Sequence, residues 1–209
     1  MSEKRAQKAS KAEVLDHLRN MLGDQAVVVV KKVEEFSAEN LPDKARATLE
    51  AFDETLGGMG IYQVPIGIKP AGIYRSFGYV KVYFSRPRVE DYTRFIVQTS
   101  IGYLEELLKK IVRMRLWDII KDGDSTPIGK LVSQARGKLT KELYADLSWM
   151  SSAIGNFAKH HYNMENDEEP QPDHYFSVAE AAAVYLMARK LGLQLQAHCR
   201  IKEETLTQG

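Results

Sequence analysis

Residues 92–114 read YTRFIVQTSIGYLEELLKKIVRM, and this stretch decides the fold. Its apolar residues recur every three or four positions, which is the period of an amphipathic helix with one buried face. The main row is Tyr92, Ile96, Thr99, Tyr103, Leu107, Ile111 and Met114, and a second row is Phe95, Leu104, Leu108 and Val112. The pattern predicts a helix that begins after Pro87 and runs for about 28 residues, or about 42 Å at 1.5 Å per residue.

Three shorter helical patterns follow this long one. Thr126 and Pro127 place a capping residue before a proline at the first helical position, which predicts the start of the second helix. Ser177, with Glu180 three residues later, forms a capping box that predicts the start of the fourth. The apolar positions of the three helices are Ile128, Leu131, Val132 and Ala135; Leu143, Leu147, Met150, Ile154 and Phe157; and Val178, Ala182, Tyr185 and Leu186. We therefore expect a four-helix bundle over residues 88–193.

The region before the bundle is expected to contain helices and one insert of different character. Helical spacing covers residues 14–22, 26–36 and 42–56, although the valines of the second segment also suit a strand. Residues 57–86 are rich in glycine and aromatic residues. Their alternation over 79–84 predicts a short strand, with 61–68 as its hairpin partner. The predicted fold is mainly α, with an N-terminal region over 1–86 and the bundle over 87–209.

Composition excludes several classes of protein. The chain of 209 residues is 44% hydrophobic, so a sizeable core is expected. Its 29 Lys and Arg against 28 Asp and Glu give a net charge of +1, so binding to nucleic acid would need a local basic patch. Cys199 is the only cysteine, which excludes an internal disulfide and a zinc finger. No apolar run approaches the roughly 20 residues of a membrane span, and no hydrophobic segment follows Met1. A cytoplasmic protein without a cofactor is expected.

The segment 155–163, GNFAKHHYN, carries the residues best suited to chemistry. Asn156 and His160 are four positions apart, so they share one face of a helix. A histidine beside an amide can act as a general base or acid, and Lys159 can offer a cation to a phosphate. The alternative is structural: histidines at a helix end interact with the helix dipole, and His161 falls on the side of the core.

The order of these features resembles the HEPN superfamily, the helical domains of prokaryotic toxin, antiviral-defence and nucleotidyltransferase-partner proteins. The resemblance covers about residues 88–193. It rests on the long first helix, the short helix at Thr126-Pro127 and the Asn-x-x-Lys-His ending over 156–160. The Phe-Ser-Val-Ala-Glu-Ala opening of the fourth helix, residues 176–181, adds to it.

Active HEPN proteins are metal-independent ribonucleases with an arginine, a polar residue and a histidine four to six positions after the arginine. By this resemblance, His160 or His161 matches the histidine and Asn156 the polar residue. The arginine position falls on or beside Gly155, and no arginine lies between Arg136 and His160. The resemblance therefore implies a noncatalytic binding or interaction module that forms a homodimer through its third helices, in a defence or toxin–antitoxin setting.

Two other functions stay open. One is a metal-independent endoribonuclease with a rewired site around Asn156, Lys159 and His160. In this interpretation Arg113, Arg115 or Arg136 reaches the site from another helix. The other is a nucleotide or small-ligand sensor, with a pocket between the insert and the bundle. A binding function would involve RNA or a partner protein.

A basic and aromatic segment over 69–94 is the best candidate for a nucleic-acid surface, through Arg75, Lys81, Arg86 and Arg88. Aromatic rings stack on bases and the cations bind phosphates. The alternative is a strand packed on the bundle, with cations that discourage edge aggregation. The acidic loop over 165–174 could join the histidines at a metal, but a solvated loop is the preferred interpretation and no metal is predicted.

Overall fold

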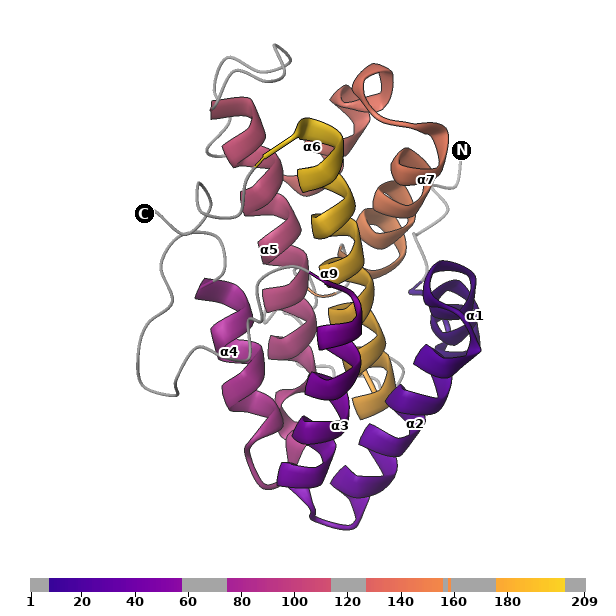
Figure 1. Ribbon diagram of the computed structural model, residues 1–209, viewed down its shortest axis with the longest axis vertical. Helices are drawn as coiled ribbons and strands as arrows, with labels where there is room; N and C mark the ends of the chain where they lie inside the picture. Colours follow the sequence, from indigo (N-terminus) through magenta and orange to yellow (C-terminus); the bar gives the residue numbers. More distant parts are fainter. Residues whose placement is uncertain (1–7, 58–74, 114–126, 156–157, 159–175, 202–209) are drawn as a thin grey trace, which may run out of the picture.

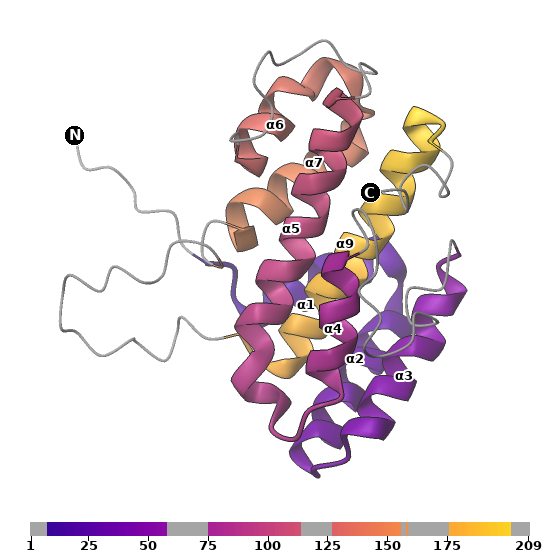
Figure 2. The ribbon, with the colours of Figure 1, turned by 90° about the vertical axis from the view of Figure 1, so that its left-hand side faces the viewer.

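The computed structural model describes residues 8–57, 75–113, 127–155, 158 and 176–201, and within these ranges it is helical with no strand. Helices α5 (Thr93–Arg113) and α9 (Val178–Cys199) lie side by side and run in the same direction at the centre of the molecule (Figures 1 and 2). Every residue of α9 from Val178 to Arg189 is buried. A helix that is apolar on nearly all sides is stable only when neighbours cover all of them.

The remaining helices cover these two. Helices α1 (Lys11–Leu22), α2 (Asp24–Ala38) and α3 (Pro42–Thr55) pack on α9, and α4 (Arg75–Phe84) packs on α5. Helices α6 (Ile128–Gln134) and α7 (Lys141–Trp149) lie toward the C-terminal ends of α5 and α9 (Figure 1). The short elements are the 3-10 helices η3 (Val89–Tyr92) and η4 (Arg136–Lys138) and the π-helix η5 (Met150–Gly155).

Side chains from both sides of the predicted boundary at residues 86 and 87 contribute to one core. The boundary itself stays a prediction. None of the helices within the described ranges is long and apolar enough to cross a membrane.

Several local predictions are confirmed. The segment 26–36 is helical, as part of α2, and Val30 and Val33 are fully buried. Pro42 is the first residue of α3, where its missing N–H costs nothing. The Ser177 capping box is present, because the Glu180 N–H donates to Ser177 Oγ at 3.1 Å and the Ser177 N–H donates to the Glu180 carboxylate at 2.7 Å.

The predicted strand over 79–84 is wrong, because these residues belong to α4. In so short a stretch, an alternating pattern also contains two apolar residues four positions apart, which share one face of a helix. Val80 and Phe84, four positions apart, are both fully buried, which places one face of a helix in the core. The expected hairpin partner at 61–68 lies outside the described residues.

Two helix starts differ from the prediction. The long helix begins at Thr93 after the 3-10 turn, because Arg88 adopts a left-handed conformation with φ of 57° that interrupts a helix from Pro87. Helix α6 begins at Ile128, with Pro127 as its capping residue, and Thr126 lies outside the described residues. Phe95, expected to widen the buried stripe of the long helix, is 49% exposed.

Candidate nucleic-acid interface

The candidate residues lie outside the described part of the chain; they are Asn156, Lys159, His160 and His161. The structure does describe the residues that lead to them. Helix α7 continues into the π-helix η5, a rare geometry that is often found beside functional sites. No signal in the sequence indicated this change of helix type.

The end of the third helix packs closely on α5. A Cβ atom added to Gly155 would lie 3.4 Å from Ile101 Cγ2, so the Ile101 side chain packs against the chain at position 155. Further on, the Gln98 side chain donates a hydrogen bond to the carbonyl of Ala158. Position 155 thus meets 101 and position 158 meets 98, which means that the third helix runs antiparallel to α5.

This antiparallel packing singles out Arg94. It lies one helical turn before Gln98 on α5 and therefore on the same side of that helix. Arg113, which sequence reasoning considered as the missing cation, is paired with Glu106 at 3.3 Å near the opposite end of α5. Sequence reasoning missed Gln98 and considered Arg94 only as the end of the basic and aromatic segment over 69–94, although their spacing of four residues beside an apolar stripe was a usable signal.

An aromatic cluster lies on the neighbouring flank of α5. The Tyr83 ring of α4 stacks on Tyr92 with centroids 5.6 Å apart, and it lies 6.0 Å from the Phe95 ring. Burial raises the pKa of Tyr83, and the nearby Tyr79 and Tyr92 hydroxyls raise it further. Tyr79 is 43% exposed, so it and Phe95 present aromatic surface to solvent at the edge of the cluster.

Only part of the predicted basic set is exposed in the turn between Tyr83 and Tyr92. Arg86 and Arg88 are exposed, and Arg88 makes an ion pair with Asp91 at 3.1 Å. Lys81 instead packs toward α3, where it lies 3.7 Å from Glu50. Arg75 is the first residue of α4, and its side chain lies outside the described part.

The N-terminal turn of α5 connects the two candidate regions. Phe95 follows Arg94 directly and therefore points about 100° further around the helix. The aromatic cluster thus occupies one flank of α5, and the chain leading to the candidate histidines packs on the next flank. The fold thus makes neighbours of two regions that are 60 residues apart in the sequence, as the hydrogen bond between Gln98 and Ala158 shows.

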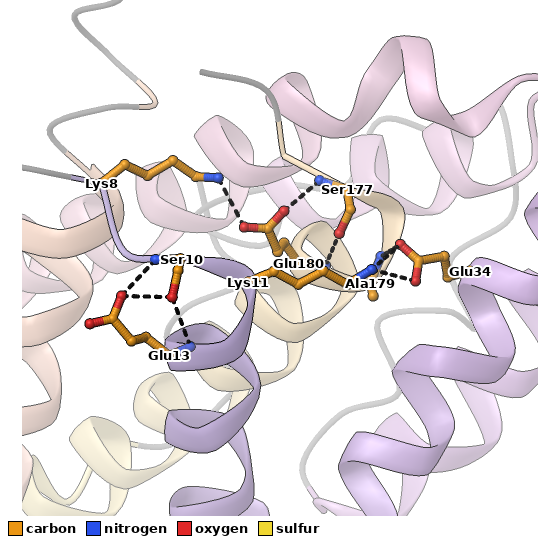
Figure 3. A network of polar contacts seen from close by, with 8 residues as sticks. All are labelled: Lys8, Ser10, Lys11, Glu13, Glu34, Ser177, Ala179 and Glu180. Atoms are coloured by element: carbon orange, nitrogen blue, oxygen red, sulfur yellow. Dashed lines mark hydrogen bonds and ion pairs between the residues drawn. The ribbon is translucent and has the colours of Figure 1, made fainter. Parts of the chain in front are cut away.

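The polar network at the N-terminal end of α9, in contrast, has a structural explanation (Figure 3). Lys8 Nζ lies 2.9 Å from Glu180, whose carboxylate also caps α9. Glu34 accepts hydrogen bonds from Lys11 and, at 3.4 Å, from the Ala179 N–H. These carboxylates satisfy backbone donors that a helix start leaves unpaired, so the network explains where α9 begins.

A buried ion pair joins α3 to α9. Arg189 Nε donates to Asp53 Oδ1 at 3.1 Å, and Arg189 Nη2 donates to the Gly57 carbonyl at 3.3 Å. Burial raises the pKa of Asp53, and the Arg189 charge opposes that rise. Both side chains are almost fully covered, so the pair is part of the core and offers no surface to a ligand.

Among the described residues no group of three or more histidines, cysteines and carboxylates could hold a metal. The acidic loop over 165–174 lies outside them. In comparisons with known proteins, no family profile, curated protein or solved structure matches this chain.

Proposed function

We propose that this protein is a noncatalytic HEPN-like module that binds single-stranded RNA. The binding region is an aromatic–arginine surface formed by Tyr79, Tyr83, Tyr92, Phe95, Arg86 and Arg88. The observation that carries the proposal is the exposed aromatic edge of this cluster, together with two exposed arginines in the turn that joins Tyr83 to Tyr92. A ring that is half exposed, and held from behind by other rings, is a ready platform for a base.

Single-stranded RNA fits such a surface better than a duplex. Unpaired bases can turn a free face toward an aromatic ring, whereas the bases of a duplex are stacked on one another. The neighbouring guanidinium groups can then contact the phosphates on either side of a stacked base. Glu90 and Asp91 lie in the same turn as Arg88. Their negative charges oppose the positive potential after Arg88, so we expect the phosphates to bind on the side of Arg86.

Fluorescence anisotropy with a labelled single-stranded RNA of about a dozen nucleotides tests this proposal. Phe95→Ala should weaken binding by about 5- to 150-fold, because stacking is worth about 1–3 kcal/mol per base. Val28→Ala is the matched control, since Val28 is 51% exposed on α2, away from the surface. Equal affinities of the two variants, or equal binding of duplex RNA, would contradict the stacking role. If Phe95→Ala lost binding to a protein partner but kept its affinity for RNA, the result would favour a protein-interaction surface.

The resemblance also supports a homodimer that forms through the third helices, in a defence or toxin–antitoxin setting. Sedimentation equilibrium of the purified protein tests the oligomeric state directly. A mass of 23.7 kDa at every concentration would contradict the dimer.

A second candidate function is a metal-independent endoribonuclease, which the placement of Arg94 favours. His160 would take the proton of a 2′-hydroxyl, and the 2′-oxygen would attack the adjacent phosphorus. The 5′-oxygen would then leave with the bonding electron pair and receive the proton that His160 took up, so the products are a 2′,3′-cyclic phosphate and a 5′-hydroxyl. Arg94 would stabilise the charge that develops on the phosphate oxygens, which is the role of the motif arginine.

Cleavage of RNA in the presence of EDTA separates the two functions. Activity that falls by about 10²- to 10⁴-fold in His160→Ala or His161→Ala would refute the noncatalytic proposal. Arg94→Gln should then also lose activity, whereas Arg113→Gln, at the far end of α5, should keep it. Absence of cleavage, or cleavage that survives both histidine substitutions, would refute the enzyme.

A further inference from the structure

A second basic region lies where α6 turns into α7. Residues 127–141 contain four basic residues and no acidic one, in a chain whose charges otherwise nearly balance. All four side chains are exposed. We call these residues, Lys130, Arg136, Lys138 and Lys141, the basic corner.

The basic corner differs from several other basic regions of the described chain in having no carboxylate partner. Within the described ranges none of its four cations forms an ion pair with a carboxylate. The cations of α1, α3 and the C-terminal half of α5 are mostly paired, as in Lys11–Glu34, Arg46–Asp43 and Lys109–Glu105. Unpaired like charges that share a short turn repel one another and create a positive potential that attracts an anionic partner.

The corner is held in a defined shape. His198 Nε2 lies 2.6 Å from the Lys138 carbonyl oxygen, so this nitrogen carries the proton and donates it. The contact ties the end of α9, with the exposed Arg200 two residues later, to η4. The Arg136 guanidinium also lies 5.7 Å from the centre of the Tyr144 ring, which restricts its position.

We propose that the basic corner binds the phosphate backbone of the RNA that stacks on the aromatic–arginine surface, an inference that rests on the proposed function. The charges suit any polyanion, but the surroundings favour phosphates. The exposed large apolar side chains among the described residues are Val28, Tyr79 and Phe95, none of which lies at the corner. A protein interface needs apolar or aromatic anchors at its centre, and a membrane-surface site needs an apolar face, whereas phosphate contacts need neither.

The position of the corner suits a strand that also reaches the aromatic cluster. The Ile128 N–H, at the start of α6, donates to Glu105 of α5 at 3.3 Å. Glu105 lies ten residues after Phe95, or about 15 Å along the helix axis. The helix that leads into the corner therefore begins about 15 Å along α5 from the stacking platform, and a single strand that binds both would follow α5 between them.

The salt dependence of RNA binding tests this inference. The variant Lys138→Gln/Lys141→Gln is compared with Lys31→Gln/Lys32→Gln, which removes the same charge from exposed positions of α2. If both corner lysines contact phosphates, the slope of log K against log salt should become shallower by about 1.4, because each contact on a single strand contributes about 0.7. The α2 variant should keep the slope of the unaltered protein.

Equal slopes for the two double variants would refute the proposal that the basic corner binds RNA phosphates. Equal slopes are also the result expected if the corner binds an acidic protein instead. Phe95→Ala, measured in parallel, should weaken binding and leave the slope unchanged, because stacking releases no counterions. A corner effect without a Phe95 effect would keep the corner and refute the stacking surface. Weaker binding of Phe95→Ala, with no change of slope in the corner variant, would keep the stacking surface and refute the corner.

Discussion

Substitution of Gly192 by alanine tests the central contact of the fold. Gly192 lies in the interior of α9, where its missing side chain leaves room for the ring of Tyr103 from α5. A Cβ atom at this position would lie 2.0 Å from the Tyr103 hydroxyl oxygen and 2.5 Å from two ring carbons. Real Cβ atoms do not approach so closely, and Tyr103 is fully buried, so its ring has no solvent to move into.

The expected cost is the difference of two opposing effects. Alanine in place of a helical glycine favours the helix by up to about 1 kcal/mol. Overpacking of a core costs about 1–3 kcal/mol, and the displaced Tyr103 also loses the hydrogen bond that Gln196 Nε2 donates to it at 3.3 Å, worth about 1 kcal/mol. The free energy of unfolding should therefore fall by about 1–3 kcal/mol, which lowers Tm by about 2–12 °C in a protein of this size.

Thermal and urea unfolding, followed by circular dichroism, measure this change. Gly102→Ala is the matched control, because Gly102 lies inside α5 and a Cβ there meets nothing within 4 Å. That variant should be more stable than the unaltered protein by about 1 kcal/mol. Tyr103→Leu should recover part of the loss in the Gly192→Ala background. If Gly192→Ala unfolds at or above the Tm of the unaltered protein, the close approach of α5 and α9 is refuted.

Four further substitutions and conditions give defined outcomes. Arg189→Met leaves Asp53 buried without its cation, so urea denaturation should show a loss of about 3–5 kcal/mol. Burial lowers the pKa of His17 more than a neighbouring carboxylate raises it, so the neutral form is favoured in the fold. Stability should therefore fall as pH drops below about 6.5, the ordinary pKa of histidine, and His17→Gln should flatten that dependence in urea titrations at several pH values. Burial raises the pKa of Cys199 to about 11, so at pH 8 a thiol reagent should react slowly with the native protein and rapidly in urea. Arg88→Gly removes a left-handed arginine, so the unfolding free energy should not fall in denaturant titrations, while anisotropy should show weaker RNA binding.

Features that depend on neighbouring residues in the chain were predictable. The Ser177 capping box needs only a hydroxyl and a carboxylate three positions apart, and it forms as expected. The helix over 26–36 follows from the spacing of its valines, although their β-branched side chains also suit a strand. The strand predicted over 79–84 failed because its alternating pattern also holds the pair Val80 and Phe84, which α4 buries in the core.

The candidate sites show the same division. Sequence patterns singled out Arg86 and Arg88, which are exposed, but they could not separate these from Lys81, whose partner Glu50 is 31 positions away in the chain. They also included Phe95 in the buried stripe, although α4 leaves that ring half exposed. The basic corner needed both kinds of information, because its charges are visible in the sequence, whereas their lack of carboxylate partners among the described residues is not.

The sequence by itself determined where most helices lie and how α3 and α9 begin, because helical period, proline positions and caps act over three or four residues. The tertiary structure decided which polar groups meet across long separations. Gln98 meets Ala158, Arg189 meets Asp53, and Gly192 admits the Tyr103 ring. Such contacts depend on how two helices pack side by side, and no local pattern of residues specifies that register.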